Sequence, residues 1–155
     1  MLKPLLISVG IMGICLVIHI TGLVWLGEQL ILRREKIGRK VSSGYTSMVL
    51  MVVFSIVIVL HVTEACIWAG FFFWHGLFQN FETSLYFSLT SYSTVGYGDV
   101  LLPHDWRLLG TGEALAGVLL CGLSAAFLFA IVNAIFRFRN PEPQPEVARA
   151  GANER

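Results

Sequence analysis

The chain has 155 residues, of which 55% are hydrophobic and 14% are charged, and its mean hydropathy is +0.71. A soluble domain of this length usually carries about 25% charged residues, so the composition indicates a membrane protein. The formal net charge of +1 argues against a nucleic-acid-binding role, and Cys15, Cys66 and Cys121 lie in separate apolar runs rather than in a disulfide framework.

Three apolar runs are long enough to cross a membrane, which takes roughly 20 residues for a hydrocarbon core of about 30 Å. They comprise residues 4–26, 47–73 and 114–136, and Glu64 is the only Asp, Glu, Lys or Arg in them. We expect each run to form a helix, because in lipid every backbone amide must find an internal partner. The first run, preceded by Lys3, resembles a signal peptide, but it is too long for one and lacks a small-residue cleavage site, so we expect a retained helix.

Basic residues predict how these spans are oriented. They gather in the first loop, as Arg33, Arg34, Lys36, Arg39 and Lys40, and after the third span, as Arg137 and Arg139. The positive-inside rule places both segments in the cytoplasm. We therefore expect the N-terminus outside, the C-terminus inside, and the segment between the second and third spans outside.

Residues 74–108, between the second and third spans, predict a re-entrant segment. Thr83 or Ser84 could cap a short helix, with Glu82 near its positive end. About three turns would carry the chain part way into the membrane, and it must then turn back because the third span also starts outside. Irregular backbone is tolerated at this depth only where it is buried in protein or lines a watery cavity.

The motif Thr94-Val95-Gly96-Tyr97-Gly98-Asp99 follows this predicted helix. Glycine adopts positive φ without steric penalty, so alternating handedness could point successive carbonyls to one side of the strand. Four such strands around an axis would stack rings of carbonyl oxygens that could replace the water shell of a potassium ion. One chain supplies one strand and the sequence contains no repeat of it, so we expect a homotetramer in the lipid bilayer.

The motif resembles the signature of potassium channels, for which a TVGYG loop is the standard filter. Residues 47–137 resemble the bacterial two-helix potassium channel pore, and residues 1–46 add a further transmembrane helix and a basic loop in front of it. The resemblance implies an all-α membrane protein with three transmembrane helices, a re-entrant pore helix and a selectivity filter, in the tetrameric architecture of potassium channels. Residues 138–155 would be a short disordered cytoplasmic tail.

The same resemblance implies roles for the motif residues. The potassium ligands would be the carbonyls of Thr94, Val95, Gly96 and Tyr97, together with the threonine hydroxyl. Gly98 would let the chain leave the filter, and Asp99 would attract cations at the outer mouth. Many relatives carry a hydrogen-bond donor where Phe87 stands, so the filter would need another brace, for which Tyr86 and Tyr92 are candidates.

The resemblance also assigns parts of the inner helix. Gly117 falls at the position of a hinge glycine, although close helix packing explains the small residues of this helix equally well. The positions that would line the cavity below the filter are Val118, Cys121 and Ala125, with Phe129 and Asn133 near the cytoplasmic constriction. A ring of four phenylalanines could gate by dewetting, and simple packing of Phe129 is an equal alternative.

Four ionisable side chains, His19, His61, Glu64 and Glu113, lie within or near the spans, where such residues are costly. His61 and Glu64 are three residues apart and share a helix face. With Glu113 they form a candidate proton-sensitive cluster behind the pore helix. The alternative is a set of satisfied hydrogen bonds that dock the helices.

These patterns predict passive, potassium-selective conduction. A weakly selective cation channel and a non-conducting pore-like scaffold are the alternatives. An active transporter would usually show paired inverted repeats, and this sequence shows none. The sequence shows no phosphate-binding loop, metal-ligand spacing or nucleophile motif, so we expect neither an enzyme nor a small-molecule substrate. The loop over residues 27–46 could lie on the anionic membrane surface or be a solvated linker.

Overall fold

The computed structural model describes residues 2–33 and 43–139. In chain order its elements are α1 (Leu2–Arg33), α2 (Ser43–Trp74), α3 (Phe81–Tyr92), a 3-10 turn η1 (His104–Trp106) and α4 (Arg107–Arg139). Residues 140–155 of the predicted tail and residues 34–42 of the predicted basic loop lie outside the described residues. The remaining residues of both segments are helical and belong to α1, α2 and α4, so the loop is shorter and the tail starts later than predicted.

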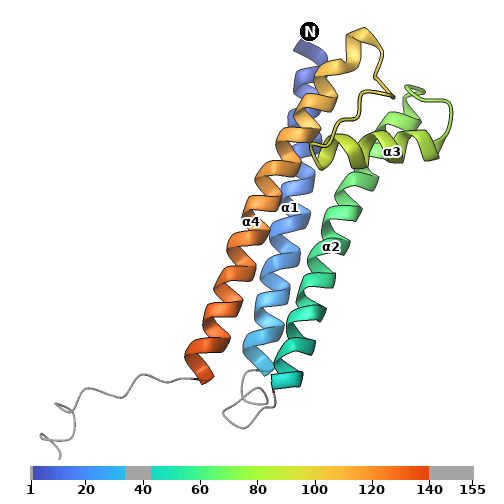
Figure 1. Ribbon diagram of the computed structural model, residues 1–155. Coiled ribbons are helices and arrows are strands. Elements are labelled where there is room, and N and C mark those ends of the chain that lie inside the picture. Colours follow the sequence, from blue (N-terminus) through green and yellow to red (C-terminus); the bar gives the residue numbers. More distant parts are fainter. Residues whose placement is uncertain (1, 34–42, 140–155) are drawn as a thin grey trace, which may run out of the picture.

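Within the described part of the chain, α1, α2 and α4 are long and apolar enough to cross a membrane, which confirms the predicted all-α membrane architecture. Each helix extends beyond both ends of the apolar run predicted for it. The three helices lie side by side, with α2 running opposite to α1 and α4 (Figure 1). The N-terminus of α1, the whole of α3 and the start of α4 therefore lie at one end of the bundle.

Helix α1 buries one stripe of side chains and exposes the rest. The buried stripe contains Ser8, Ile11, Cys15, His19, Leu23 and Leu26, a spacing of three or four residues that places them on one helix face. This face packs against α2 and α4, and more extensively against α4. Leu6, Val9 and Val17 are among the apolar side chains on the outward side, as expected for a helix that contacts lipid.

The short helix α3 starts earlier than its sequence suggested. Its N-cap is Asn80, whose side-chain oxygen accepts a hydrogen bond from the backbone N–H of Thr83 at 2.7 Å. The prediction of a cap at Thr83 or Ser84 is therefore wrong, because asparagine at the preceding turn satisfies the free amides first. Glu82 lies in the first turn, as expected for an acid near the positive end of a helix.

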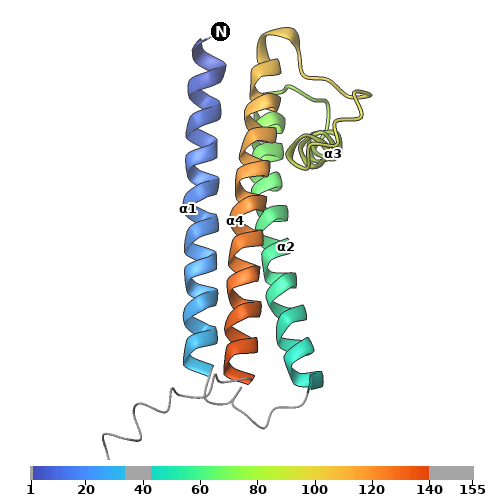
Figure 2. The same cartoon turned by 60° about the vertical axis from the view of Figure 1, so that its left-hand side comes forward.

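Helices α1 and α3 lie on opposite sides of the α2–α4 pair (Figure 2). Beneath α3, an aromatic core joins it to α2 and α4, with Trp68, Phe72, Phe87 and Leu109 all buried. Phe72 meets Phe87 edge-on, at 5.4 Å between ring centroids. Phe87, which cannot donate a hydrogen bond, thus serves as an apolar anchor of α3.

Candidate functional site

The backbone of the glycine-rich motif alternates in handedness, as its sequence predicted. Thr94, Gly96 and Gly98 have φ of 61°, 50° and 78°, whereas Val95 and Tyr97 between them do not have positive φ. Thr94 is the one non-glycine residue with positive φ in the described ranges, and such a conformation is strained for a β-branched residue. Strain of this kind persists only where the surroundings enforce it, which marks this strand as a functional candidate.

Two backbone hydrogen bonds hold the base of this strand against the last turn of α3. The N–H of Thr94 donates to the carbonyl of Ser91 at 2.9 Å, and the N–H of Gly96 donates to the carbonyl of Thr90 at 3.0 Å. Helix α3 therefore ends directly at the strand, and its position fixes that of the strand.

Tyr86 supplies a brace at the other end of the motif. Its hydroxyl donates to a carboxylate oxygen of Asp99 at 2.7 Å. This bond raises the pKa of the Tyr86 hydroxyl above its ordinary value, because ionisation would remove the donor and place two negative charges together. One of the two tyrosines named as candidate braces thus reaches the motif from the outer side.

The motif is exposed along one side of the isolated subunit, where Val95 and Tyr97 are 53% and 72% exposed. One face of α4 is exposed as well, and it carries the residues expected to line a cavity or gate: Val118, Cys121, Ala125, Phe129 and Asn133. Their spacing of three or four residues puts them on a single side of the helix. Within the described part of the chain, no hydrogen bond reaches the carbonyls of Thr94 to Tyr97, and no other element covers this face of α4.

Gly117 lies on the opposite, buried side of α4. A Cβ atom at this position would lie 1.9 Å from the carbonyl oxygen of Tyr92 at the end of α3. The structure therefore gives Gly117 a packing reason, since only glycine allows this approach of the two backbones. The hinge role stays a prediction.

Glu113 lies behind α3 in a hydrogen-bonded group of its own. Ser88 contacts both Glu113 and the carbonyl oxygen of Ala65, the latter at 2.6 Å. A serine hydroxyl has one proton to donate, so both bonds form together only if Glu113 is protonated and donates to Ser88. The second carboxyl oxygen of Glu113 is buried and has no partner among the described residues. The structure thus separates Glu113 from His61 and Glu64, with which the sequence had grouped it.

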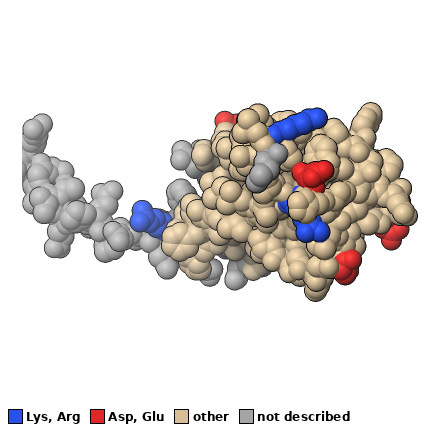
Figure 3. All heavy atoms as spheres, turned by 90° about the horizontal axis from the view of Figure 1, so that it is seen from above, with Lys and Arg blue, Asp and Glu red and all other residues tan. Residues whose placement is uncertain are grey.

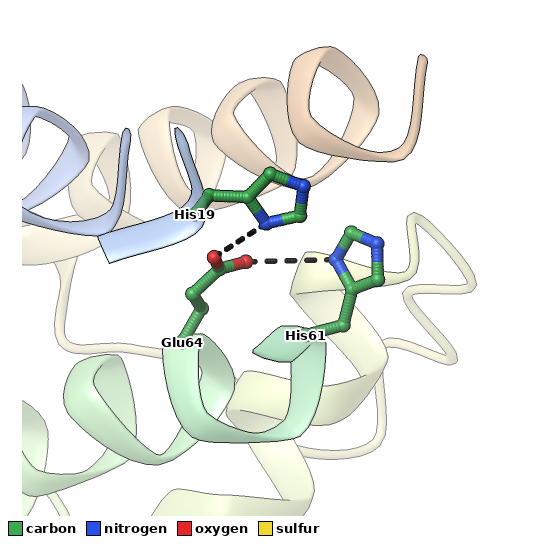
Figure 4. Close-up of side chains that lie close together, drawn as sticks. All are labelled: His19, His61 and Glu64. Atoms are coloured by element: carbon green, nitrogen blue, oxygen red, sulfur yellow. Dashed lines mark hydrogen bonds and ion pairs between the residues drawn. The ribbon is translucent and has the colours of Figure 1, made fainter. Parts of the chain in front are cut away.

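His19 takes the place expected for Glu113. Its Nδ1 lies 2.7 Å from Glu64 Oε1, and His61 Nδ1 lies 3.5 Å from Glu64 Oε2 (Figure 4). His19 and Glu64 are fully buried. One donor atom from each of the three residues lies within 4.8 Å of the other two, a spacing that would suit a metal ion.

Two further residues belong to this cluster, Ser124 and Tyr92, and the sequence analysis assigned neither of them to it. The Oγ of Ser124 on α4 lies 2.9 Å from His19 Nε2 and 3.0 Å from His61 Nε2. The Tyr92 hydroxyl on α3 donates to Glu64 and lies 2.9 Å from His61 Nδ1. Ser124 gave no signal, since a serine among small residues of a membrane helix usually serves close packing.

The end of the bundle that carries α3 has few charges. Figure 3 shows isolated basic and acidic side chains on a surface that is mostly uncharged. Asp99 is exposed there and follows the exposed motif directly. Its expected role, to attract cations toward the carbonyls of the strand, stays a prediction.

A family model described as an ion channel matches residues 47–134, more than half of the chain. The match takes in α2, α3, the glycine-rich motif and most of α4, and it leaves out α1. No curated protein and no solved structure gives a significant match. The chain therefore belongs to this ion channel family.

Proposed function

We propose that the protein is a potassium-selective channel formed by four copies of this chain, with Thr94, Val95, Gly96 and Tyr97 supplying the carbonyls that bind K⁺. The observation that carries this proposal is the alternation of positive φ at Thr94, Gly96 and Gly98. In an ordinary strand successive carbonyls point to opposite sides, whereas this alternation turns them toward a common side. Such carbonyls can replace the hydration shell of a permeant ion.

The exposed surfaces support the assembly. A single subunit leaves the motif and the Val118–Phe129 face of α4 uncovered, and these are the surfaces that would face the axis of a tetramer. Helix α3 ends at Tyr92, just before the motif, so its partially negative C-terminus would also favour a cation at the base of the filter.

The arrangement of the helices supports the proposed orientation. The motif lies at the end where α1 begins, and α4 ends at the opposite end of the bundle (Figure 1). Exposed Arg137 stands near that opposite end and favours the cytoplasm, which puts the filter and the N-terminus outside.

Ion flux into liposomes that contain the purified protein tests this proposal. We expect K⁺ flux that Na⁺ does not replace, that Ba²⁺ blocks, and that Gly96→Ala abolishes. Gly76→Ala is the matched control, because Gly76 also has positive φ, of 65°, and also has free space around it, but it lies outside the motif. If Gly76→Ala loses flux as completely as Gly96→Ala, backbone strain alone explains the loss and the filter assignment fails.

Two other outcomes would replace the proposal. Equal fluxes of K⁺ and Na⁺ would identify a weakly selective cation channel. A tetramer, measured by native mass spectrometry, that carries no flux even after Phe129→Ala has removed the candidate constriction would identify a non-conducting scaffold.

A further inference from the structure

Five side chains form a closed ring of hydrogen bonds between the helices. From Glu64 on α2 the ring passes to His19 on α1 at 2.7 Å and on to Ser124 on α4 at 2.9 Å. From Ser124 it continues to His61 at 3.0 Å and to the hydroxyl of Tyr92 on α3 at 2.9 Å. The Tyr92 hydroxyl donates back to Glu64 and closes the ring.

The ring contains as many protons as bonds when its net charge is zero. Five hydrogen bonds need five protons. In a neutral ring, each of the five side chains carries one and donates it to the next: Glu64 to His19, His19 to Ser124, Ser124 to His61, His61 to Tyr92, and Tyr92 to Glu64. Moving one proton from Glu64 to His19 gives a carboxylate and an imidazolium, and every bond is still made.

A change in the number of protons either opens the ring or charges it. With one fewer, two acceptors face each other at some position. With one more, both histidines donate to the Ser124 oxygen, which can accept two bonds, and the hydroxyl proton of Ser124 leaves the ring. Either change also leaves a net charge among groups that are mostly buried, because His19 and Glu64 are fully covered and Tyr92 and Ser124 are nearly so. Burial of an uncompensated charge is far more costly than burial of a neutral, fully bonded ring.

A metal ion is the competing explanation for this cluster. Two histidine nitrogens and one carboxylate at this spacing could ligate zinc. However, each of these donor atoms already has a hydrogen-bond partner within the ring, and five protons make the ring neutral without an ion. The hydrogen bonds therefore account for the geometry.

We propose that this ring is the device that positions the base of the filter, and that α1 takes part in ion selection through it. The proposal rests on the proposed potassium-channel function. Tyr92 stands two residues before Thr94, and its own carbonyl is seated on Gly117. The ring holds the other end of the Tyr92 side chain. Because α1 lies on the far side of the α2–α4 pair from α3, His19 connects α1 to the pore helix through the ring.

Two substitutions of Glu64 test whether the ring or a charge is needed. In Glu64→Gln the amide N–H can donate to His19 while the amide oxygen accepts from Tyr92, so the five-proton ring is kept without a carboxylate. Glu64→Leu opens it. We expect the K⁺/Na⁺ permeability ratio, taken from reversal potentials, to stay near the wild-type value in Glu64→Gln. Glu64→Leu removes the bonds to both His19 and Tyr92, so the ratio should fall by at least about tenfold, the scale of a single lost buried hydrogen bond.

The reversal potential is the chosen readout because it does not depend on how many channels fold. Thr63→Val is the matched control, since Thr63 is the neighbouring residue on α2 and its hydroxyl bonds only to the carbonyl of Val59 in its own helix. We expect this variant to keep the wild-type ratio. Equal loss of selectivity in Glu64→Gln and Glu64→Leu would overturn the ring in favour of an ion pair or a metal site. A shift of the wild-type ratio on treatment with a chelator would also overturn it, in favour of the metal.

A double-mutant cycle tests the ring without any ion flux. Tyr92→Phe and Ser124→Ala each open the ring, at positions that do not bond to each other. We expect each to lower the thermal unfolding midpoint of the purified protein in detergent, and the double variant to lie close to the worse single one. Additive losses would show that the five side chains are not one unit. Ser88→Ala is the control for this cycle, because the Ser88 hydroxyl belongs to the separate Glu113 group. Its effect on the unfolding midpoint should add to that of Tyr92→Phe.

The two kinds of experiment separate the two proposals. If the wild-type protein carries no selective flux while the cycle shows strong coupling, the proposed channel function fails and the ring stands as a structural unit. If the flux is selective while the cycle is additive and Glu64→Leu keeps its selectivity, the ring fails and the channel stands.

Discussion

The buried ring and the exposed glycine-rich motif are two polar regions of this subunit, and they differ in how far one chain completes them. Within the ring, the five side chains that bridge the four helices all find partners in the same chain. In the filter strand, residues from Ser93 to Asp99 are exposed, and three of them have positive φ. In the proposed tetramer, one subunit thus finishes the support of the filter, and the other copies complete the filter itself.

This difference separates two requirements of a selective channel. Binding sites for ions need backbone carbonyls that are free to exchange water for an ion, so they cannot be consumed by hydrogen bonds within the subunit. Free backbone is unstable unless neighbouring structure holds it in place. The contacts of α3 with Gly117, Asp99 and the ring provide that support from three directions.

Gly117→Ala should have the largest effect, because it displaces α3 as a whole. The added methyl group would lie 1.9 Å from the carbonyl oxygen of Tyr92, and a backbone atom at the end of a helix cannot move away cheaply. We expect a loss of at least about 3 kcal/mol in the free energy of unfolding, measured by denaturant titration in detergent. Gly70→Ala, where nothing lies within 4 Å of the added atom, should leave stability unchanged or raise it. A Gly117→Ala protein of normal stability would show that α3 is not seated on α4.

Tyr86→Phe should have an intermediate effect confined to the outer mouth. It removes the hydrogen bond to Asp99 and leaves the ring intact, so K⁺ flux should fall roughly threefold, the scale of one solvent-accessible hydrogen bond, with the same K⁺/Na⁺ ratio. Tyr45→Phe is the control, because Tyr45 is an exposed tyrosine near the start of α2, far from the motif. A changed ion ratio in Tyr86→Phe would contradict the division between mouth and filter base.

The same bond predicts how the outer mouth responds to alkali. The pKa of Tyr86 is raised above its ordinary value of 10.0 by the bond to Asp99. A raised pKa in the folded state means that the contribution is present below pH 10 and is lost only as pH rises through the raised value. The Tyr86-dependent part of the flux should therefore be constant from neutral pH to pH 10 and decline beyond it. A decline centred below pH 10 would contradict this.

Glu113→Gln should have the smallest effect. If Glu113 is protonated and donates to Ser88, a glutamine amide can donate in its place. The free energy of unfolding should then change by less than about 0.5 kcal/mol. Infrared spectroscopy offers a direct check, because the wild-type protein should absorb as a protonated carboxyl group at neutral pH and lose part of that absorption in Glu113→Gln. An unchanged spectrum would mean that Glu113 is ionised.

The features that could be predicted from the sequence are those that depend on the local pattern of residues. The apolar runs predicted the three long helices, and the glycine spacing predicted positive φ at Gly96 and Gly98. Positive φ at Thr94 was not foreseen, because a β-branched residue has no local preference for it. The cap at Asn80 was missed because several residues nearby can cap a helix, and sequence alone does not rank them.

The cluster behind the filter depends on how the helices are packed, and sequence carries little of that information. His19 and Glu64 are 45 residues apart, and their contact follows from the rotation of α1 against α2. Glu113 and Glu64 are both glutamates at a similar depth in the spans, yet they have different partners. Helix α4 places Glu113 against Ser88, whereas it places Ser124 against the two histidines. The residue types in a span predict that polar partners exist, whereas the packing decides which partners they are.

The position of α1 opposite α3 has a consequence for how the membrane acts on this protein. In the proposed tetramer α1 would lie at the outer perimeter, on the side of the subunit away from α3, and its exposed Leu6, Val9 and Val17 would contact the acyl chains. A change in bilayer thickness acts first on such a perimeter, by tilting its helices. In our proposal, His19 carries that tilt from α1 to the ring behind the filter.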